Sequence, residues 1–223
     1  MTLVINPRAT YDREYGLIRD DLLRMGSHID NATGRAVEAL RHRDLALARQ
    51  VVNDDVFIND LRFHIEEACL TLIATQQPTA GDLRNVIAVM NAVGDLERMG
   101  DHAAGIAKTV IRMGDEPLIK PLVDIPRMAD LTRSMLRRCL DAFVARDATT
   151  ARVIAEEDDE IDHLYRTVLD ELLVIMAADP ATVRRATYLL WCAHNLERIG
   201  DRVTNIAERV VFMRTGDMKE LNV

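Results

Sequence analysis

Acidic residues, one of them replaced by an amide, recur four residues apart in this chain, and this spacing is its strongest chemical signal. There are four such pairs, and two of them form a group in each half: Asp55/Asn59 with Glu97/Asp101, and Asp158/Asp162 with Glu197/Asp201. A four-residue spacing places both members on one helix face, about 5–6 Å apart at Cβ. Like charges so placed repel, and a bound cation would turn that repulsion into coordination because hard cations take carboxylate oxygens. The pattern predicts a metal site in each half.

Two further oxygen ligands extend the second group. Asn205 and Glu208 follow on the next turns of the same predicted helix, whereas the matched places in the first half hold Gly105 and Lys108. A lysine ammonium repels a metal cation, so we expect the second-half site to bind metal more tightly. Carboxylate oxygens suit Mg²⁺, Mn²⁺, Ca²⁺ and iron, and the spacing does not choose among them.

Each acidic pair taken alone also fits a solvated helix face, and only the recurrence of pairs at matched positions favours a metal site. Other reactive residues point to packing. Cys69, Cys139 and Cys192 are far apart in apolar stretches, which predicts buried free thiols. His102 follows the acidic stripe directly and points about 100° away from it on a helix. Trp191 has the helical spacing of a core residue.

The chain contains an internal duplication. Residues 36–61 align with residues 139–164 at an offset of 103, and residues 94–108 align with residues 194–208 at an offset of 100. The difference of three residues falls near residues 76–82 and 179–181, where we expect loops. Two halves of similar structure follow from this pattern.

Composition favours an all-α fold. The chain has 223 residues, of which 48% are hydrophobic, 4% aromatic, ten Gly and six Pro. Gly and Pro together reach about half of their usual share, which argues against a turn-rich β protein and against disorder. The predicted helices are listed by half: 8–43, 46–75 and 80–113, then 122–146, 149–177 and 181–214. Asp44 and Asp147 are the expected N-caps of the second helix in each half.

Long helices joined by short loops pack antiparallel. We therefore expect two tandem up-down-up three-helix bundles related by a pseudo-twofold axis, with domains at 1–116 and 117–223. In the first helix of the second half, the spacing of five residues is that of the buried seam of such a bundle: Met128, Leu131, Met135, Cys139 and Ala142.

Charge and hydropathy limit the partners. There are 28 basic and 36 acidic residues, a net charge of −8, so phosphate backbones and anionic lipid head groups repel the chain. No stretch approaches the roughly 20 apolar residues needed to span a bilayer, and the N-terminus lacks the pattern of a signal peptide. We expect a cytoplasmic protein with no nucleic acid partner and no direct membrane insertion.

Three motifs make the chain similar to a known family: QQPTAGDLR at 76–84, DLERMGDH at 95–102 and NLERIGDRVTNIAE at 195–208. With the acidic pairs, they resemble the PhoU family of phosphate-specific transport system accessory proteins over nearly the whole length. The resemblance implies tandem three-helix bundles that bind multinuclear metal clusters at the acidic motifs, with iron, zinc, magnesium and manganese as the candidate metals.

The resemblance also implies a function that the residues alone do not reveal. It suggests a negative regulator of phosphate uptake and of the phosphate-starvation response. Such a regulator couples the phosphate ABC transporter, through its ATPase subunit, to a sensor histidine kinase, commonly as a homodimer. The resemblance further implies a protein that is not an enzyme.

Two alternatives remain at this point. One is a helical adaptor that binds no metal. The other is a ferritin-like di-metal oxidase, which needs Glu-x-x-His motifs on two helices and a Glu from each of two more. The chain offers one such motif, Glu160-x-x-His163, with Phe57 and Asp60 at the matched places. Motifs of hydrolases are also missing from the sequence.

Overall fold

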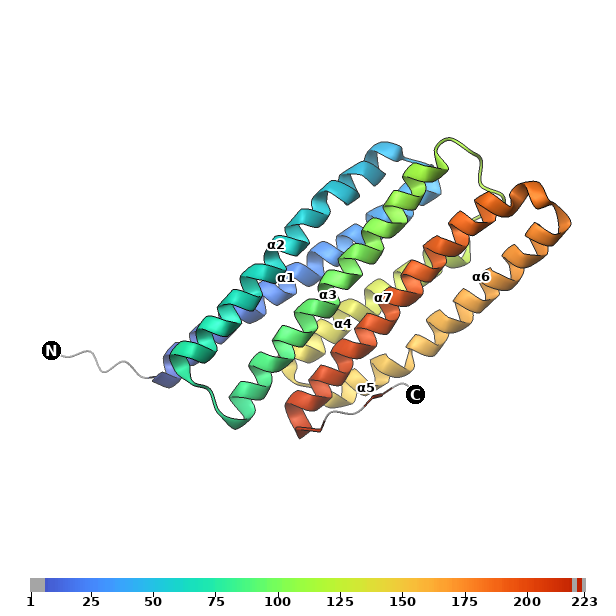
Figure 1. The fold of residues 1–223 in the computed structure, drawn as a ribbon. Coiled ribbons are helices and arrows are strands. Elements are labelled where there is room, and N and C mark those ends of the chain that lie inside the picture. The colour runs from blue at the N-terminus through green and yellow to red at the C-terminus, as the bar shows by residue number, and fades with distance from the viewer. Residues whose placement is uncertain (1–6, 218–219, 222–223) are drawn as a thin grey trace.

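The computed structural model describes residues 7–217 and 220–221, and this part of the chain is helical without strands. Its elements are α1 (Pro7–His42), α2 (Leu45–Gln76), α3 (Ala80–Met113), α4 (Asp124–Ala145), α5 (Ala148–Glu156), α6 (Asp158–Ala178), the 3₁₀ turn η1 (Pro180–Thr182) and α7 (Val183–Thr215). The long helices run side by side along one direction (Figure 1). The expected all-α bundle fold is confirmed.

Each half forms an up-down-up bundle, and the two bundles pack against each other. Helices α1, α2 and α3 make the first, and α4, the α5–α6 pair and α7 make the second. Helices α3 and α7 lie side by side through the middle of the molecule, and α1 contacts α4 (Figure 1). The predicted division at 116/117 falls in the connection of residues 114–123 and stays a prediction.

The same turn chemistry begins the second helix of each half. Asp44 and Asp147 accept hydrogen bonds from backbone N–H groups in the first turns of α2 and α5, which confirms both predicted N-caps. The preceding residues, Arg43 and Arg146, have left-handed φ angles of 55° and 54°. Side-chain acceptors satisfy helix N–H groups that lack an intrahelical partner.

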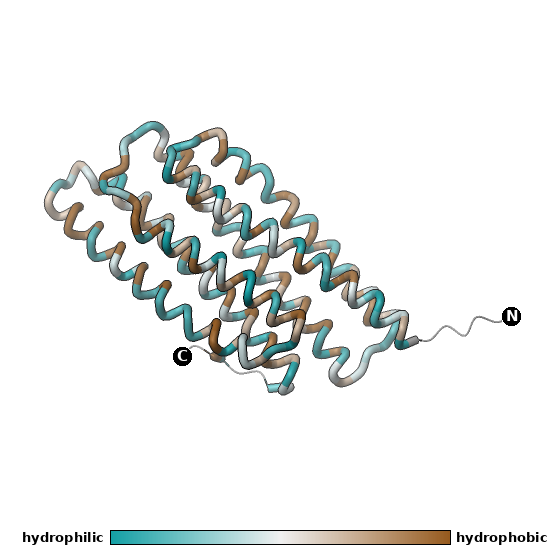
Figure 2. Tube along the Cα trace, turned by 180° about the vertical axis from the view of Figure 1, so that it is seen from behind, coloured by the Kyte–Doolittle hydropathy of each residue, from teal (hydrophilic) through white to brown (hydrophobic). Residues whose placement is uncertain are grey.

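Apolar side chains from both halves form one continuous core. Hydrophilic and hydrophobic residues alternate along each helix (Figure 2), as expected where one face is buried. The predicted seam is confirmed at four of its five positions, because Met128, Met135, Cys139 and Ala142 are buried in α4, whereas Leu131 is only partly buried. All three cysteines are buried free thiols, as expected. Among the described helices, none has a stretch long and apolar enough to cross a membrane.

Two predictions about the second half are wrong. The single helix expected at 149–177 is divided into α5 and α6 at Glu157. There the backbone N–H of Glu157 donates to the carbonyl of Ile154, and the N–H of Glu160 donates to the carbonyl of Glu157, which is the spacing of a 3₁₀ turn. Trp191 is not a core residue: its side chain is 53% exposed beside the ring of His194. Other residues of α7, such as the adjacent Cys192, point toward the core instead.

Candidate metal centres

The second acidic group depends on a close approach between α6 and α7. A Cβ atom added to Gly200 would lie 2.6 Å from Asp158 Oδ1 and 2.9 Å from Ile161 Cδ1, closer than non-bonded atoms pack. Only glycine lets these helices meet here. The contact brings the buried Asp158 next to the turn of α7 that carries Asp201, so the expected adjacency of the second and third helices is confirmed.

A broad groove of about 790 Å³ collects most of the second group. It is lined by residues of α6, α7 and the C-terminal segment: Asp158, Asp159, Asp162, Arg166, Arg198, Asp201, Arg202, Thr204, Asn205, Glu208, Arg209 and Glu220. Glu197 does not line this groove but lies close enough to feel the charges of Asp201 and Asp162. Glu208 accepts a hydrogen bond of 3.1 Å from the backbone N–H of Leu221.

Crowded negative charge perturbs the carboxyl groups beside this groove. Burial, helped by the charge of Asp201, raises the pKa of Glu197 from 4.5 to about 7. Burial is also the main cause of the raised pKa of Asp201, to which Asp162 adds. Oε2 of Glu197 is buried without a hydrogen bond and lies 3.3 Å from His194 Nδ1. The site therefore holds negative charge at a cost that a cation would relieve.

Arginines neutralise part of this charge in the structure as it stands. Arg198 pairs with Asp201 at 2.6 Å, and Arg166 pairs with Asp162 at 3.2 Å. In residues 7–217 and 220–221, no group of three or more His, Cys, Asp or Glu side chains is arranged to hold an ion. The donor set, oxygen ligands with an unsatisfied buried Glu197 oxygen among them, nevertheless fits a hard cation. Loading the site requires these arginines to release their carboxylates.

The first group has a similar contact between α2 and α3, with slightly longer distances than at Gly200. A Cβ atom on Gly100 would lie 3.0 Å from Ile58 Cδ1 and 3.3 Å from Asp55 Oδ1. Asp55 Oδ1 is buried without a hydrogen bond, and Asn59 Nδ2 donates to Oδ2 at 3.3 Å. Burial and the charge of Asp101 raise the pKa of Asp55. The contact with Gly100 places Asp55 of α2 next to the turn of α3 that carries Asp101.

Two cationic side chains act on the first group. Lys108 opposes the rise in the pKa of Asp55, so its ammonium is near that carboxylate. Arg62 pairs with Glu97 at 3.0 Å, and Asp101 is exposed. The positive charge of Lys108 supports the expectation that this site binds metal less tightly than the second. That ranking stays a prediction.

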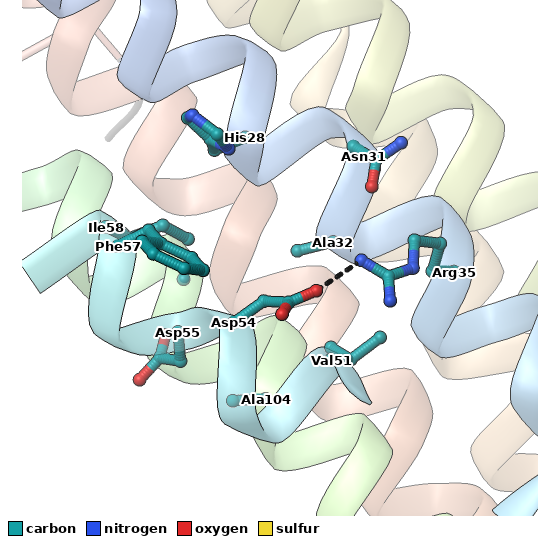
Figure 3. A pocket seen from close by; sticks show the side chains of 11 residues that line it. His28, Asn31, Ala32, Arg35, Val51, Asp54, Asp55, Phe57, Ile58 and Ala104 are labelled. Atoms are coloured by element: carbon teal, nitrogen blue, oxygen red, sulfur yellow. Dashed lines mark hydrogen bonds and ion pairs between the residues drawn. The ribbon is translucent and has the colours of Figure 1, made fainter. Parts of the chain in front are cut away.

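A repeated ion pair beside both groups was missed by the sequence reasoning. Arg35 pairs with Asp54 at 2.6 Å across the mouth of a cavity next to Asp55 (Figure 3). At the offset of 103, Arg138 binds both carboxylate oxygens of Glu157 at 2.7 Å. The signal was present in the sequence, because both partners of each pair match at the duplication offset. These pairs tie the first helix of each half to the second, directly beside the acidic cluster.

Polar contacts across the α3–α7 interface were also missed. Asp95 accepts hydrogen bonds from Asn205 Nδ2 at 3.0 Å and from Arg202 at 3.3 Å. At the matched places, His102 Nδ1 lies 3.0 Å from Asn195 Oδ1. Asn205, predicted as a further ligand, is therefore held by the other half of the chain, and His102 is used in the interface.

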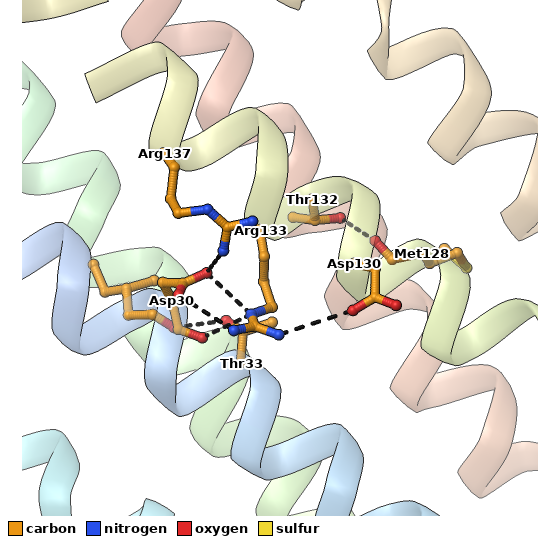
Figure 4. A network of polar contacts seen from close by, with 8 residues as sticks. Asp30, Thr33, Met128, Asp130, Thr132, Arg133 and Arg137 are labelled. Carbon is orange, nitrogen blue, oxygen red and sulfur yellow. Dashed lines mark hydrogen bonds and ion pairs between the residues drawn. The ribbon is translucent and has the colours of Figure 1, made fainter. Parts of the chain in front are cut away.

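A third polar network joins α1 to α4. Asp30 accepts hydrogen bonds from Arg133 at 3.0 Å and from Arg137 at 2.7 Å (Figure 4). A Cβ atom on Gly34 would lie 2.9 Å from the guanidinium carbon of Arg133, so this glycine makes room for the pair. Both bundles are thus fixed to each other on two faces, by α1 with α4 and by α3 with α7.

A duplicated all-α bundle with an acidic cluster between the second and third helices of each half defines the class of protein. Comparison with known proteins gives the family. The PhoU domain family matches residues 22–110 and 125–210. The chain therefore belongs to the PhoU family, as the motifs suggested.

Named relatives and solved structures are similar over nearly the full length. The "Phosphate-specific transport system accessory protein PhoU homolog" of Clostridium acetobutylicum is 37% identical over 216 residues, covering 96% of this chain and 99% of that protein. The crystal structure of PhoU from Pseudomonas aeruginosa has a TM-score of 0.88 at 35% identity, covering 93% of this chain and 100% of that one. The crystal structure of "the phosphate transport system regulatory protein PhoU" from Streptococcus pneumoniae has a TM-score of 0.88 at 34% identity, covering 94% and 99%.

Substitution of Gly200 tests the close helix contact. Gly200→Ala forces a methyl group against the Asp158 carboxylate, and we expect a loss of about 1–3 kcal/mol in the free energy of unfolding. Gly94→Ala is the control, because a Cβ atom there meets nothing within 4 Å and alanine favours a helix by about 0.5–1 kcal/mol. Urea unfolding measures both variants. Equal stabilities for the two variants would contradict the contact.

The raised pKa of Glu197 predicts a pH-dependent stability in the metal-free protein. Its folded pKa of about 7 exceeds the usual 4.5, so its contribution to stability is present below about pH 4.5 and is lost as pH rises through about 7. Glu197→Gln removes this loss. Relative to the original protein, the variant should gain about 1–3 kcal/mol between about pH 5 and pH 8.

Urea unfolding in the presence of a chelator measures this gain. Glu156→Gln, at an exposed position of α5, controls for the loss of one charge from the surface. A stability difference between Glu197→Gln and the original protein that is the same at both pH values would show that Glu197 is not strained by its surroundings.

Proposed function

We propose that this chain is a metal-binding accessory protein of phosphate transport that negatively regulates phosphate uptake and the phosphate-starvation response. The accessory role rests on relatives so named that align with this chain from end to end, with 99% of the Clostridium acetobutylicum protein covered. The Streptococcus pneumoniae structure carries the description of a regulatory protein. One observation of the structure carries the metal-binding part: carboxylates from α6 and α7 line one groove beside a buried, unsatisfied Glu197 oxygen.

The ligands of each proposed site come from two helices. In the second half, Asp158 and Asp162 on α6 face Glu197 and Asp201 on α7, with Asn205 and Glu208 as further ligands. In the first half, Asp55 and Asn59 on α2 face Glu97 and Asp101 on α3. Iron, zinc, magnesium and manganese are the candidate metals, and a bound ion would supply positive charge that these carboxylates lack.

Positive charge at these sites gives a physical route to regulation. The chain has a net charge of −8, and its carboxylates concentrate charge on the faces of α6–α7 and α2–α3. Metal loading neutralises these faces and frees Arg166 and Arg198 from their present partners. The neutralised face would then dock on the ATPase subunit of the phosphate ABC transporter and on a sensor histidine kinase, with the chain acting as a homodimer. Like-charge repulsion is thereby replaced by complementarity.

The alternative function is a helical adaptor that works without metal. The ion pairs that already neutralise Asp201 and Glu97 favour it, because they satisfy part of the acidic charge in the absence of a cation. A di-metal oxidase has less support: its one Glu-x-x-His motif lies on an exposed face, with Glu160 paired to Arg127.

Calorimetric titration with Mn²⁺ tests the two sites. We expect Glu197→Ala/Asp201→Ala to remove the tighter binding and Glu97→Ala/Asp101→Ala to remove the weaker binding, because Lys108 opposes a cation only in the first half. The Kd values of the two sites should differ by about tenfold or more, which corresponds to ~1.4 kcal/mol in binding free energy. Equal losses of affinity would contradict the ranking, and no Mn²⁺ binding by the original protein would contradict the metal sites.

Pull-down with the purified ATPase subunit and kinase tests the regulatory part. We expect binding to fall about tenfold after chelation or after alanine replacement of all eight paired ligands. Unchanged yields in both cases would favour the metal-independent adaptor. Failure of the original protein to bind either partner, with or without metal, would contradict the accessory role itself.

A further inference from the structure

An open groove runs along the contact between α1 and α2, away from the candidate metal ligands. It has a volume of about 360 Å³. Its apolar lining comes from Leu17, Ile18, Ala68 and Leu72, and its polar lining from Glu14, Asp21, His64, Glu67 and Thr71. None of these residues belongs to either acidic pair group, so the groove is a different surface from the candidate metal sites.

Large apolar side chains stand exposed at and beside this groove. Leu17 on α1 lines the groove and is 61% exposed, whereas Phe63 and Leu70 on α2 are 62% and 57% exposed but do not line it. Phe63 and Leu70 are seven residues apart and therefore share a helix face. Apolar side chains gathered on a surface and bordered by charges mark interaction sites more often than solvated faces.

In the second half an ion pair occupies the matched place of the groove, although Leu173 and Val174 beside it are 50% and 69% exposed. At the offset of 103, Lys120 stands in place of Leu17 and Glu171 in place of Ala68, and these two form an ion pair. Leu118, Ile119 and Leu122 of the connecting segment also pack against the core there. Arg166 replaces the exposed Phe63. The bundle therefore does not need an open apolar groove for its own stability, and the first half retains one.

Charge selects the occupant of the groove. Three carboxylates, of Glu14, Asp21 and Glu67, line it without any lysine or arginine, and His64 lies 3.3 Å from Asp21. The arginines that pair with the first two, Arg13 and Arg24, lie outside the lining. A second copy of this chain would bring an acidic rim against an acidic rim, which electrostatic complementarity disfavours.

We propose that the α1–α2 groove binds a basic amphipathic helix of a partner protein. Its apolar side chains would enter the floor formed by Leu17 and Ala68, and its lysines or arginines would meet the carboxylates of the rim. This arrangement is the helix-in-groove mode of recognition, in which apolar anchors recur at helical spacing. The inference goes beyond the metal-dependent role, because it assigns a separate docking surface that needs no cation.

Two synthetic peptides of about 18 residues, five helical turns, test the proposal. Both carry the same leucine face, and their polar positions are all lysine in one and all glutamate in the other. Fluorescence anisotropy measures their binding to the full chain with a chelator present and at about 150 mM salt, where screening limits non-specific attraction. We expect the lysine peptide to bind at least about tenfold more tightly than the glutamate peptide.

Variants locate the binding. Leu17→Gln should weaken binding of the lysine peptide about tenfold, and Glu67→Lys should weaken it while strengthening binding of the glutamate peptide. Val174→Gln is the matched control, an exposed apolar residue of α6 at 69% exposure, and should bind like the original protein. All three positions are exposed, so we expect thermal melting by circular dichroism to show an unchanged fold.

Three results would overturn the proposal. Equal binding by the original protein and Leu17→Gln would remove the groove from the interaction. An equal loss in Val174→Gln would show general attraction to exposed apolar side chains instead of binding in the groove. A dimer that Leu17→Gln converts to monomers, seen by sedimentation, would identify a second copy as the occupant. None of these results bears on metal binding or on the pull-down with the transporter, so this proposal and the proposed function fail separately.

Discussion

Close contact between the second and third helices of each half is the constraint on which the candidate sites depend. Gly100 and Gly200 lie where a neighbouring carboxylate, of Asp55 or Asp158, approaches the helix backbone. A side chain at either position would push that carboxylate and the isoleucine beneath it away. The glycine of the E-R-x-G-D motif is thus a packing residue, and it decides how near the acidic residues of separate helices come to one another.

The electrostatic consequence is that ionising these carboxylates costs free energy. Carboxylates at Asp55, Glu197 and Asp201 have raised pKa values, chiefly because burial disfavours the ionised form. Arginines on the same helices offset part of this charge, as the Arg198–Asp201 pair does. An added cation would relieve the repulsion between these carboxylates and take the place of a local ion pair.

Duplication supplied two similar halves, and divergence gave them different surfaces. Lys108 occupies the position in the first half that Glu208 occupies in the second. The first acidic cluster therefore carries its own positive charge, whereas the second extends into a broad groove. Similarly, Lys120 and Glu171 form an ion pair in the second half, whereas the matched place in the first half is an open apolar groove. The core is shared by both halves, so these differences are confined to the outer faces.

The sequence by itself determined the helices, the duplication, the N-caps at Asp44 and Asp147 and the acidic pairs, because these depend on local spacing and on repeats within the chain. The break at Glu157 and the exposure of Trp191 depended on contacts with other helices and were missed. The same holds for the cross-helix partners of Asp95 and Arg35, although the repeat at an offset of 103 hinted at the latter. Only the tertiary structure decided which carboxylates share a groove and which arginines oppose them, because side chains far apart in the chain meet only where helices pack.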